Sequence, residues 1–334
     1  MEPFVYSRPD NATAAVREGA AGGDASATFL AGGTTLVDLM KLNVMRPTQV
    51  VDIKGLRQDD MRRITVNQDG ARLGALVTMA QAAGHPDIKR DYPVVAQSLQ
   101  LAASAQLRNM ATLGGNVLQR TRCPYFRDTS WEKCNKRNPG SGCQALEALH
   151  RQHAVMGVSD SCIATYPGDW AQSLIALDAQ VETLRAGGPR KLAFADLHKA
   201  PGNTPHVETA LEPGELIIAF FIPAGPHTKR SVYLKIRDRA SYEFALASAA
   251  VALDMDAGRV RGVRIALGGI ATTPWRALEA EQALIGMSLN EENAAKAAAI
   301  ALKSATPHED NAYKIPLAKE TIVRALLQAR ALEV

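Results

Sequence analysis

Four cysteines lie close together in this 334-residue chain and have the chemistry of metal ligands. They are Cys123, Cys134, Cys143 and Cys162, separated by ten, eight and eighteen residues, so the chain contains no CxxC pair. The lack of a CxxC pair argues against a structural zinc site. A secreted disulfide framework is normally denser in cysteine and belongs to a smaller chain. Clustering in one segment instead favours ligands around a single centre.

Basic side chains outnumber acidic ones around these cysteines. The basic residues are Arg120, Arg122, Arg127, Lys133, Lys136 and Arg137, against Asp128 and Glu132. A positive field lowers the pKa of thiols and offsets the negative charge of a four-thiolate iron–sulfur cluster. Such a cluster is therefore favoured, with two disulfides, zinc or free thiols as open alternatives. His150 and His153 are near enough to serve as ligands, but a loop histidine is more often unspecific, so they are left out.

Two Gly-Gly turns could bind phosphate groups. AGGTT (31–35) and ATLGGNV (111–117) each combine a glycine pair with threonine or asparagine side chains. A glycine turn before a helix directs unpaired backbone N–H groups at one point and allows close approach of an anion. Neither turn has the GxGxxG or Walker pattern, and one alone is more often ordinary turn chemistry. Two in one domain predict a single long phosphate-bearing ligand held from both sides, whereas the pair Gly268-Gly269 is interpreted as structural.

The composition excludes several classes of protein. A hydrophobic share of 46% and a charged share of 22% are typical of a globular protein. The net charge of +4 is spread along the chain, which argues against nucleic-acid binding. The longest largely apolar stretch, 244–253, contains one serine and is too short to span a membrane. No Ser–His–Asp, HExxH or paired-carboxylate arrangement is visible, so no catalytic residue is expected in this chain.

Helices and strands that would position these residues follow from periodicity and turn signals. We expect a strand, a glycine turn and a helix from Thr34 or Thr35 over 27–42, and a hairpin around Asp69-Gly70. The Ala- and Leu-rich stretch 91–111 predicts one helix. The remaining predictions are strands at 48–56 and 211–223, strand–turn–helix–strand over 153–184, two strands over 231–255, strand then helix over 260–284, and helices at 291–305 and 316–332. Pro223, Gly225 and Pro226 predict a domain boundary near 223–231.

The ordered set of motifs resembles the FAD-binding subunit of molybdenum hydroxylases, the xanthine dehydrogenase family. The resemblance covers nearly the whole chain and rests on FLAGGTTLVDLMK, ATLGGNV, PGDW at 167–170, YLKIRDRASYEFALASAAV and ALGGIATTPWRALEAEQALIG. Most such subunits lack a cysteine-bearing segment. RTRCPYFRD, CNKRNPGSGC and RQHAVMGVSDSCIAT are similar to a minority that binds a 4Fe–4S cluster, in particular the flavin subunit of bacterial three-subunit aldehyde oxidoreductases.

The resemblance implies an α+β fold in two parts. A two-lobed FAD-binding domain of the vanillyl-alcohol oxidase (PCMH) type is expected over 1–225, with lobes at 1–58 and 59–225 and the iron–sulfur insertion at about 120–161. A small α+β domain of the CO dehydrogenase flavoprotein type is expected over 226–334.

The resemblance also implies cofactor ligands. FAD is expected to contact Leu30, Ala31, Gly32, Gly33, Thr34, Thr35, Leu36, Thr112, Gly115, Asn116, Asp169, Ile217 and Lys235. The 4Fe–4S ligands would be Cys123, Cys134, Cys143 and Cys162. Without the family, the ordinary interpretations are a helix N-cap for Asp169 and an exposed strand lysine for Lys235.

The function implied is electron transfer in a heterotrimeric aldehyde oxidoreductase. Aldehyde would be oxidised to carboxylic acid at a molybdenum cofactor in a large subunit, and electrons would pass through 2Fe–2S clusters of a small subunit to FAD and an external acceptor. Alternatives are a hydroxybenzoyl-CoA reductase-like or xanthine dehydrogenase-like enzyme, an independent FAD oxidase, or a redox-inactive assembly module with disulfides. No signal peptide is expected at the N-terminus. The resemblance implies a periplasmic location by co-export with a signal-bearing partner, with the cytoplasm as the alternative.

Overall fold

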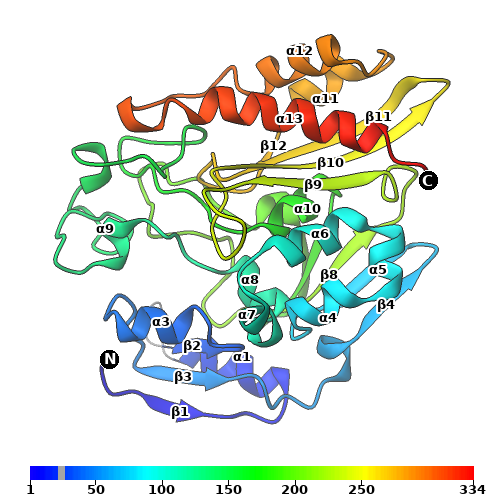
Figure 1. The fold of residues 1–334 in the computed structure, drawn as a ribbon. Coiled ribbons are helices and arrows are strands. Elements are labelled where there is room, and N and C mark those ends of the chain that lie inside the picture. The colour runs from blue at the N-terminus through cyan, green and yellow to red at the C-terminus, as the bar shows by residue number, and fades with distance from the viewer. Residues whose placement is uncertain (22–26) are drawn as a thin grey trace.

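The first lobe is a small parallel sheet with helices. The computed structural model describes residues 1–21 and 27–334. Strands β1 (Val5–Ser7), β3 (Gln49–Asp52) and β2 (Ala27–Leu30) form a three-stranded sheet in that order, with both pairs parallel. Helices α1 (Ala12–Ala21) and α3 (Leu36–Lys41) accompany it (Figure 1). The predicted strand, glycine turn and helix over 27–42 are confirmed.

The second lobe is built on a five-stranded antiparallel sheet of order β4-β5-β8-β6-β7. The strands are β4 (Ile64–Asn67), β5 (Gly70–Gly74), β6 (Gln180–Arg185), β7 (Gly188–Ala193) and β8 (Leu216–Pro223). The hairpin predicted around Asp69-Gly70 is confirmed, with Asn67 opposite Gly70. Its helices are α4 (Met79–Gly84), α5 (Pro86–Asp91), α6 (Pro93–Leu101), α7 (Ala105–Met110), α8 (Leu113–Val117) and α10 (Trp170–Ala176).

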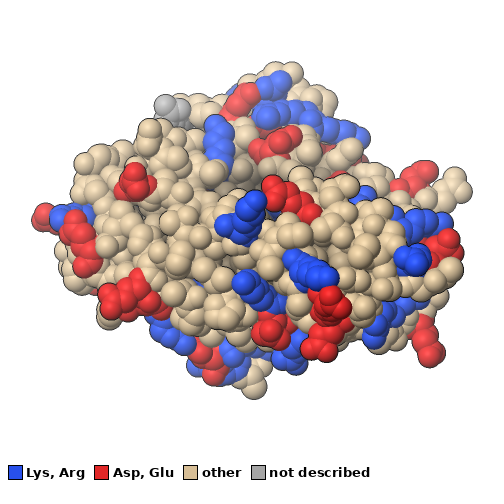
Figure 2. Space-filling view, turned by 90° about the horizontal axis from the view of Figure 1, so that it is seen from above, with Lys and Arg blue, Asp and Glu red and all other residues tan. Residues whose placement is uncertain are grey.

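The C-terminal part is a four-stranded antiparallel sheet covered by helices. Its order is β12-β11-β10-β9, from β9 (Ser231–Ile236), β10 (Ala247–Asp256), β11 (Arg259–Gly268) and β12 (Trp275–Arg276). Helices α11 (Leu278–Leu284), α12 (Glu291–Ala301) and α13 (Lys314–Arg330) lie above the sheet in Figure 1, and α6 and α10 lie below it. Seen from the side of these helices, charges of both signs are interspersed (Figure 2).

Two sequence predictions are wrong in detail. The stretch 91–111 is two helices, because the chain breaks at Ala102 and Ala103, and Ala103 has a φ of +50°. The Arg108 guanidinium donates to the Ala102 carbonyl at 2.8 Å and stabilises the break. Residues 153–166 form no strand of their own but make isolated bridges, such as that between Met156 and Ala271.

The cysteine-bearing segment is a long loop on one side of the molecule (Figure 1). It contains α9 (Pro124–Arg127) and a short 3-10 turn at Gln144–Leu146. Phe126 is fully buried against Leu39 of α3, so the segment packs directly on the first lobe. Further 3-10 turns lie at Asp59–Arg62, Phe194–Asp196 and Glu309–Asn311. Among the described residues no helix has the length and apolar character needed to cross a membrane.

Candidate functional site

A cavity of about 490 Å³ lies where the two lobes, the cysteine-bearing segment and the loop between β9 and β10 meet. This volume is in the range of cofactor and ligand sites. Five residues predicted to contact FAD line it: Thr34, Thr35, Gly115, Asn116 and Asp169. The two Gly-Gly turns, some eighty positions apart, therefore face one space, as a shared ligand requires.

The first turn fits tightly against the second lobe. A Cβ at Gly32 would lie 2.8 Å from the carbonyl carbon of Met110 and overlap its oxygen. Gly33 has a φ of +75°, in the left-handed region where glycine carries no steric cost. Leu30 and Leu36 pack into a small apolar cluster of the first lobe, so their expected contribution to a ligand is through the backbone.

The second turn is held by its own side chains. The Thr112 hydroxyl accepts a hydrogen bond from the Gly115 N–H at 3.2 Å and caps α8. A Cβ built on Gly115 would be 4.0 Å from that of Ala31, which brings the two turns into contact. The Asn116 Oδ1 is buried with no hydrogen-bond partner among the described residues. A buried orphan acceptor in this cavity fits a bound ligand that donates to it.

Substituting Gly32 tests this lobe contact. We expect Gly32→Ala to weaken FAD binding by roughly 10- to 100-fold, because relief of the clash costs about 1–3 kcal/mol and displaces the turn. Flavin content and FAD affinity of the purified protein measure the effect. Gly84→Ala is the matched control, since a Cβ at Gly84 meets nothing within 4 Å. Equal FAD binding by both variants would contradict the prediction.

Asp169 and Lys235 form a buried ion pair at the edge of this cavity. The Lys235 Nζ is 2.8 Å from Asp169 Oδ2, and the two side chains are only 1% and 5% exposed. Tyr233 donates to Asp169 Oδ1 at 2.7 Å, and Lys235 also donates to the Leu101 carbonyl. Burial raises the pKa of Asp169 even though Lys235 opposes it. Asp169 stands at the N-cap position of α10, but its side chain makes no cap hydrogen bond. The interpretation of Lys235 as an exposed strand lysine is wrong, because its side chain is buried.

Ile217 is a predicted FAD contact that lies within the sheet of the second lobe. It is 4% exposed, pairs with Thr183 in the central sheet and belongs to the main hydrophobic core. It is not among the residues that line the cavity. Its contact with FAD stays a prediction.

The four cysteines surround one small cavity of about 10 Å³, and no disulfide joins any two of them. Cys134 and Cys143 face each other across an antiparallel bridge. Backbone N–H groups are directed at three of the sulfurs. Those of Tyr125 and Phe126 are directed at Cys123, and that of Ala164 at Cys162. Those of Ala145, Leu146 and Ile163 are directed at Cys143. Over residues 1–21 and 27–334, no three His, Cys, Asp or Glu side chains are arranged to hold a metal ion.

Burial and hydrogen bonds, rather than the basic side chains, dominate the pKa shifts of Cys123, Cys143 and Cys162, although Lys136 acts to lower the pKa of Cys162. Burial raises the pKa of Cys123 to about 12. The pKa of Cys143 is lowered to about 6, first by its hydrogen bond with Cys162, whose own pKa is raised. The cations are directed elsewhere: Arg120 and Lys136 to Glu208, Arg122 and Arg127 to Asp38, Lys133 to Glu147, and Arg137 to backbone carbonyls. The predicted lowering by a basic field is wrong for Cys123.

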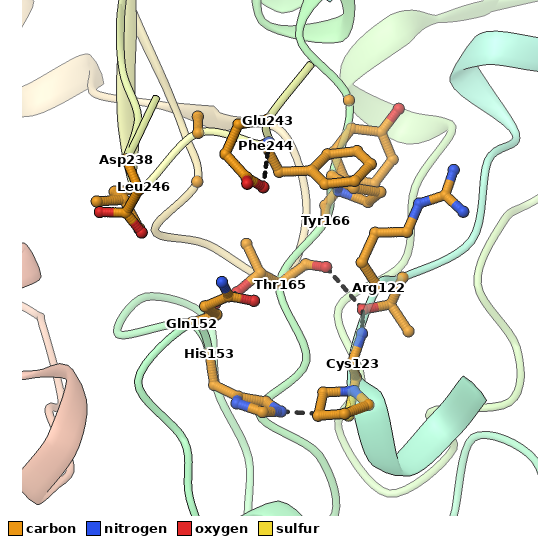
Figure 3. Close-up of a pocket in the computed structure, with 16 residues that line it drawn as sticks. Arg122, Cys123, Gln152, His153, Thr165, Tyr166, Asp238, Glu243, Phe244 and Leu246 are labelled. Atoms are coloured by element: carbon orange, nitrogen blue, oxygen red, sulfur yellow. Dashed lines mark hydrogen bonds between the residues drawn. The ribbon is translucent and has the colours of Figure 1, made fainter. Parts of the chain in front are cut away.

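His153, which the sequence analysis did not include among the cluster ligands, contacts the predicted ligand Cys123. Its Nε2 lies 3.2 Å from the Cys123 sulfur (Figure 3). Burial lowers the pKa of His153 to about 4, so the ring is neutral near pH 7. Nothing in the sequence around His153 indicates a contact with Cys123. The fold alone brings the two residues together across thirty positions.

A narrow cavity of about 50 Å³ is lined by Arg122, Cys123 and His153 among others (Figure 3). Both cavities are lined by Arg122, Pro167, Glu243 and Phe244. The narrow cavity therefore adjoins the larger cavity and also reaches Cys123, whereas the small cavity between the four cysteines has no lining residue in common with the larger one. Sequence reasoning missed Asp38, Arg122, Arg127 and the loop residues Arg239, Tyr242, Glu243 and Phe244 as cavity residues.

Glu208 anchors the cysteine-bearing segment to the second lobe. It binds Arg120 at 2.6 Å and Lys136 at 3.2 Å. Burial acts to raise its pKa, but Arg120 and Lys136 outweigh burial and hold it below the ordinary value. A lowered folded-state pKa contributes stability that is present above the unfolded-state pKa and is lost as the pH falls through the folded value.

This anchor predicts a pH dependence. We expect Glu208→Gln to lower the free energy of unfolding by about 1–3 kcal/mol at pH 7. Below the ordinary glutamate pKa, about 4.3, the variant should lose less stability with falling pH than the wild type. Denaturant unfolding between pH 7 and pH 3 measures both effects. Glu147→Gln is the control, because its pair with Lys133 is exposed and worth little. A pH profile of Glu208→Gln that matches the wild type would rule out this role.

Comparison with known proteins gives full-length matches. Residues 2–225 match the FAD binding domain in molybdopterin dehydrogenase, and residues 232–329 match the CO dehydrogenase flavoprotein C-terminal domain. The chain is 46% identical to the aldehyde oxidoreductase FAD-binding subunit PaoB of Escherichia coli (strain K12), over 99% of each chain. It is 27% identical to the carbon monoxide dehydrogenase medium chain of Afipia carboxidovorans, over 98% of this chain and 97% of that one. The solved structure of reconstituted CO dehydrogenase from Oligotropha carboxidovorans superposes with a TM-score of 0.77 at 26% identity, over 99% of each chain.

Proposed function

Because the chain belongs to the family of FAD-binding subunits of molybdenum hydroxylases, we propose that it is the FAD and 4Fe–4S electron-transfer subunit of a molybdenum-dependent aldehyde oxidoreductase. The predicted fold class is confirmed, and the chain is an oxidoreductase subunit of the aldehyde oxidoreductase type. The observation that carries the assignment to aldehyde chemistry is the 46% identity to the Escherichia coli subunit over 99% of both chains.

FAD has a suitable site in the larger cavity. When bound, FAD supplies the chemistry of accepting and passing on electrons. The residues of the chain contribute the first Gly-Gly turn, which packs against Met110 and puts Thr34 and Thr35 on the cavity wall, an unpaired buried oxygen at Asn116, and the buried pair Asp169–Lys235. These features would position a long ligand between the lobes, with a buried charge pair at the edge of its site.

The four cysteines have the chemistry that a 4Fe–4S cluster needs. They share one cavity, and backbone N–H groups are directed at Cys123, Cys143 and Cys162. Hydrogen bonds to thiolate sulfurs are a recurring way in which proteins tune such clusters. A cubane binds each thiolate at a separate iron atom, so its ligands need not converge on one point as they do for a single ion. This supports a cluster over zinc.

The partners follow from the same proposal. A large subunit with the molybdenum cofactor would oxidise the aldehyde to a carboxylic acid, and a small subunit with 2Fe–2S clusters would deliver the electrons to this chain. The carbon monoxide dehydrogenase medium chain and the aldehyde oxidoreductase FAD-binding subunit named above support a place in such a multi-subunit enzyme. An external acceptor would take the electrons from FAD. We further propose that the complex is exported to the periplasm on a partner's signal, which cell fractionation tests.

Spectroscopy of the complex tests the proposal. The chain purified with its partners is expected to show a flavin absorption band that bleaches when an aldehyde is added without an acceptor. Iron and acid-labile sulfide should include about four of each that belong to this chain. A complex without flavin, or a flavin that aldehyde leaves oxidised, would refute the electron-transfer role. Non-reducing mass spectrometry that finds two disulfides would refute the cluster.

A further inference from the structure

We infer that Arg122 and Arg127, both from the cysteine-bearing segment, bind the diphosphate of FAD. The inference rests on the FAD half of the proposed function and not on the cluster. Both side chains line the larger cavity together with Thr34 and Thr35 of the first Gly-Gly turn. The segment that carries the cysteines therefore also forms a wall of the flavin site.

Unsatisfied hydrogen-bond donors are the first argument. The Arg122 Nε and the Arg127 Nη1 are both buried and have no hydrogen-bond partner among the described residues. A buried guanidinium N–H without an acceptor is costly, since it loses its hydration and gains nothing in return. Two such donors on the wall of one cavity call for a ligand rich in acceptor oxygens.

The charge balance of the cavity is the second argument. Three acidic residues line it, and two of them already have a cation of their own: Asp169 has Lys235, and Glu243 lies 3.7 Å from Arg239. The third acidic residue faces both arginines described above.

Asp38 is this third residue, and one carboxylate cannot neutralise two guanidinium groups. Its Oδ2 lies 2.8 Å from Arg127 Nη2 and 3.6 Å from Arg122 Nη1. One positive charge therefore remains in excess. The diphosphate is the only formally anionic part of FAD, and arginine recognises phosphate oxygens with its planar array of donors. The excess charge thus favours the diphosphate over the flavin ring as the group bound.

The surroundings hold both arginines in place. Arg122 lies 5.1 Å over the Phe244 ring, and Figure 3 shows it extending away from Cys123 and His153. Arg127 is the last residue of α9, whose Phe126 is buried against the first lobe. Arg122 directly precedes Cys123, so the position of a predicted cluster ligand and that of a flavin contact are joined by one peptide bond.

Flavin-binding measurements on the purified complex test the inference. Flavin is removed reversibly and the protein is titrated with FAD and, separately, with riboflavin, which has no phosphate. We expect Arg122→Gln and Arg127→Gln each to weaken FAD binding about 10- to 100-fold, as for loss of a charged hydrogen bond, and to leave riboflavin affinity within about twofold. Inorganic diphosphate should compete with FAD on the wild type and less on either variant.

Controls separate the possible outcomes. Lys133→Gln changes an exposed lysine of the same segment that does not line the cavity, and its FAD affinity should equal that of the wild type. Arg127→Lys keeps the charge and should lose less FAD affinity than Arg127→Gln. This difference would show that the loss in Arg127→Gln is not due to misfolding. Unchanged FAD affinity, or an equal loss for riboflavin, would overturn the inference. A wild type that binds no FAD would instead overturn the proposed function.

Discussion

Replacing Asp169 with alanine is expected to destabilise the chain by about 3–5 kcal/mol, the typical cost of removing one partner from a buried ion pair. Lys235 would keep its charge in a site where its side chain is 1% exposed, with the Leu101 carbonyl as its remaining partner. The Tyr233 hydroxyl would lose its acceptor at the same time. Denaturant unfolding followed by circular dichroism measures the loss, and flavin content reports whether the cavity survives.

A second variant separates charge from packing. Asp169→Ala combined with Lys235→Met removes both charges and should recover a large part of the lost stability, because no uncompensated charge stays buried. Lys296→Ala is the control, since its pair with Glu292 on α12 is exposed on both sides and contributes little. If Asp169→Ala were no more destabilising than Lys296→Ala, the pair would have no structural role.

Replacing Cys162 with serine is expected to remove the cluster while FAD stays bound. A serine hydroxyl is a much poorer iron ligand than a thiolate, so iron should fall by about four per chain. Cys162 is buried and lies in the part of the segment that does not line the larger cavity. Iron analysis and the flavin spectrum of the same sample measure the two cofactors separately.

Ser161→Ala is the matched control for this experiment, because it changes the neighbouring residue and leaves all four cysteines in place. Iron that persists in Cys162→Ser would show that Cys162 is not a ligand. Loss of iron and FAD together would show that the cysteine-bearing segment and the flavin site form one folding unit. Cys123 lines the narrow cavity, and its neighbour Arg122 lines both the narrow and the larger cavity. We therefore expect such coupling to be strongest at Cys123.

Local signals predicted most of the fold. The hairpin at Asp69-Gly70, the strand that ends at Pro223 and the two C-terminal helices all appear where turn residues and periodicity placed them. The break at Ala102–Ala103 was missed, because alanine is a strong helix former and nothing local indicates a positive φ there. The Arg108 guanidinium, which donates to the Ala102 carbonyl, stabilises that conformation, and the sequence pattern does not show this contact.

The sequence by itself determined the chemistry available to this protein: two Gly-Gly turns, four cysteines and a basic segment. Residue types and short spacings suffice for that, because turns and thiol ligands are local properties. The tertiary structure alone decided which charges meet. Asp38 meets Arg127 across 89 positions, and Asp169 meets Lys235 across 66. Such pairs depend on burial and on the packing of distant elements. For the same reason only the tertiary structure shows that Arg122 and Arg127 of the basic segment also line the larger cavity.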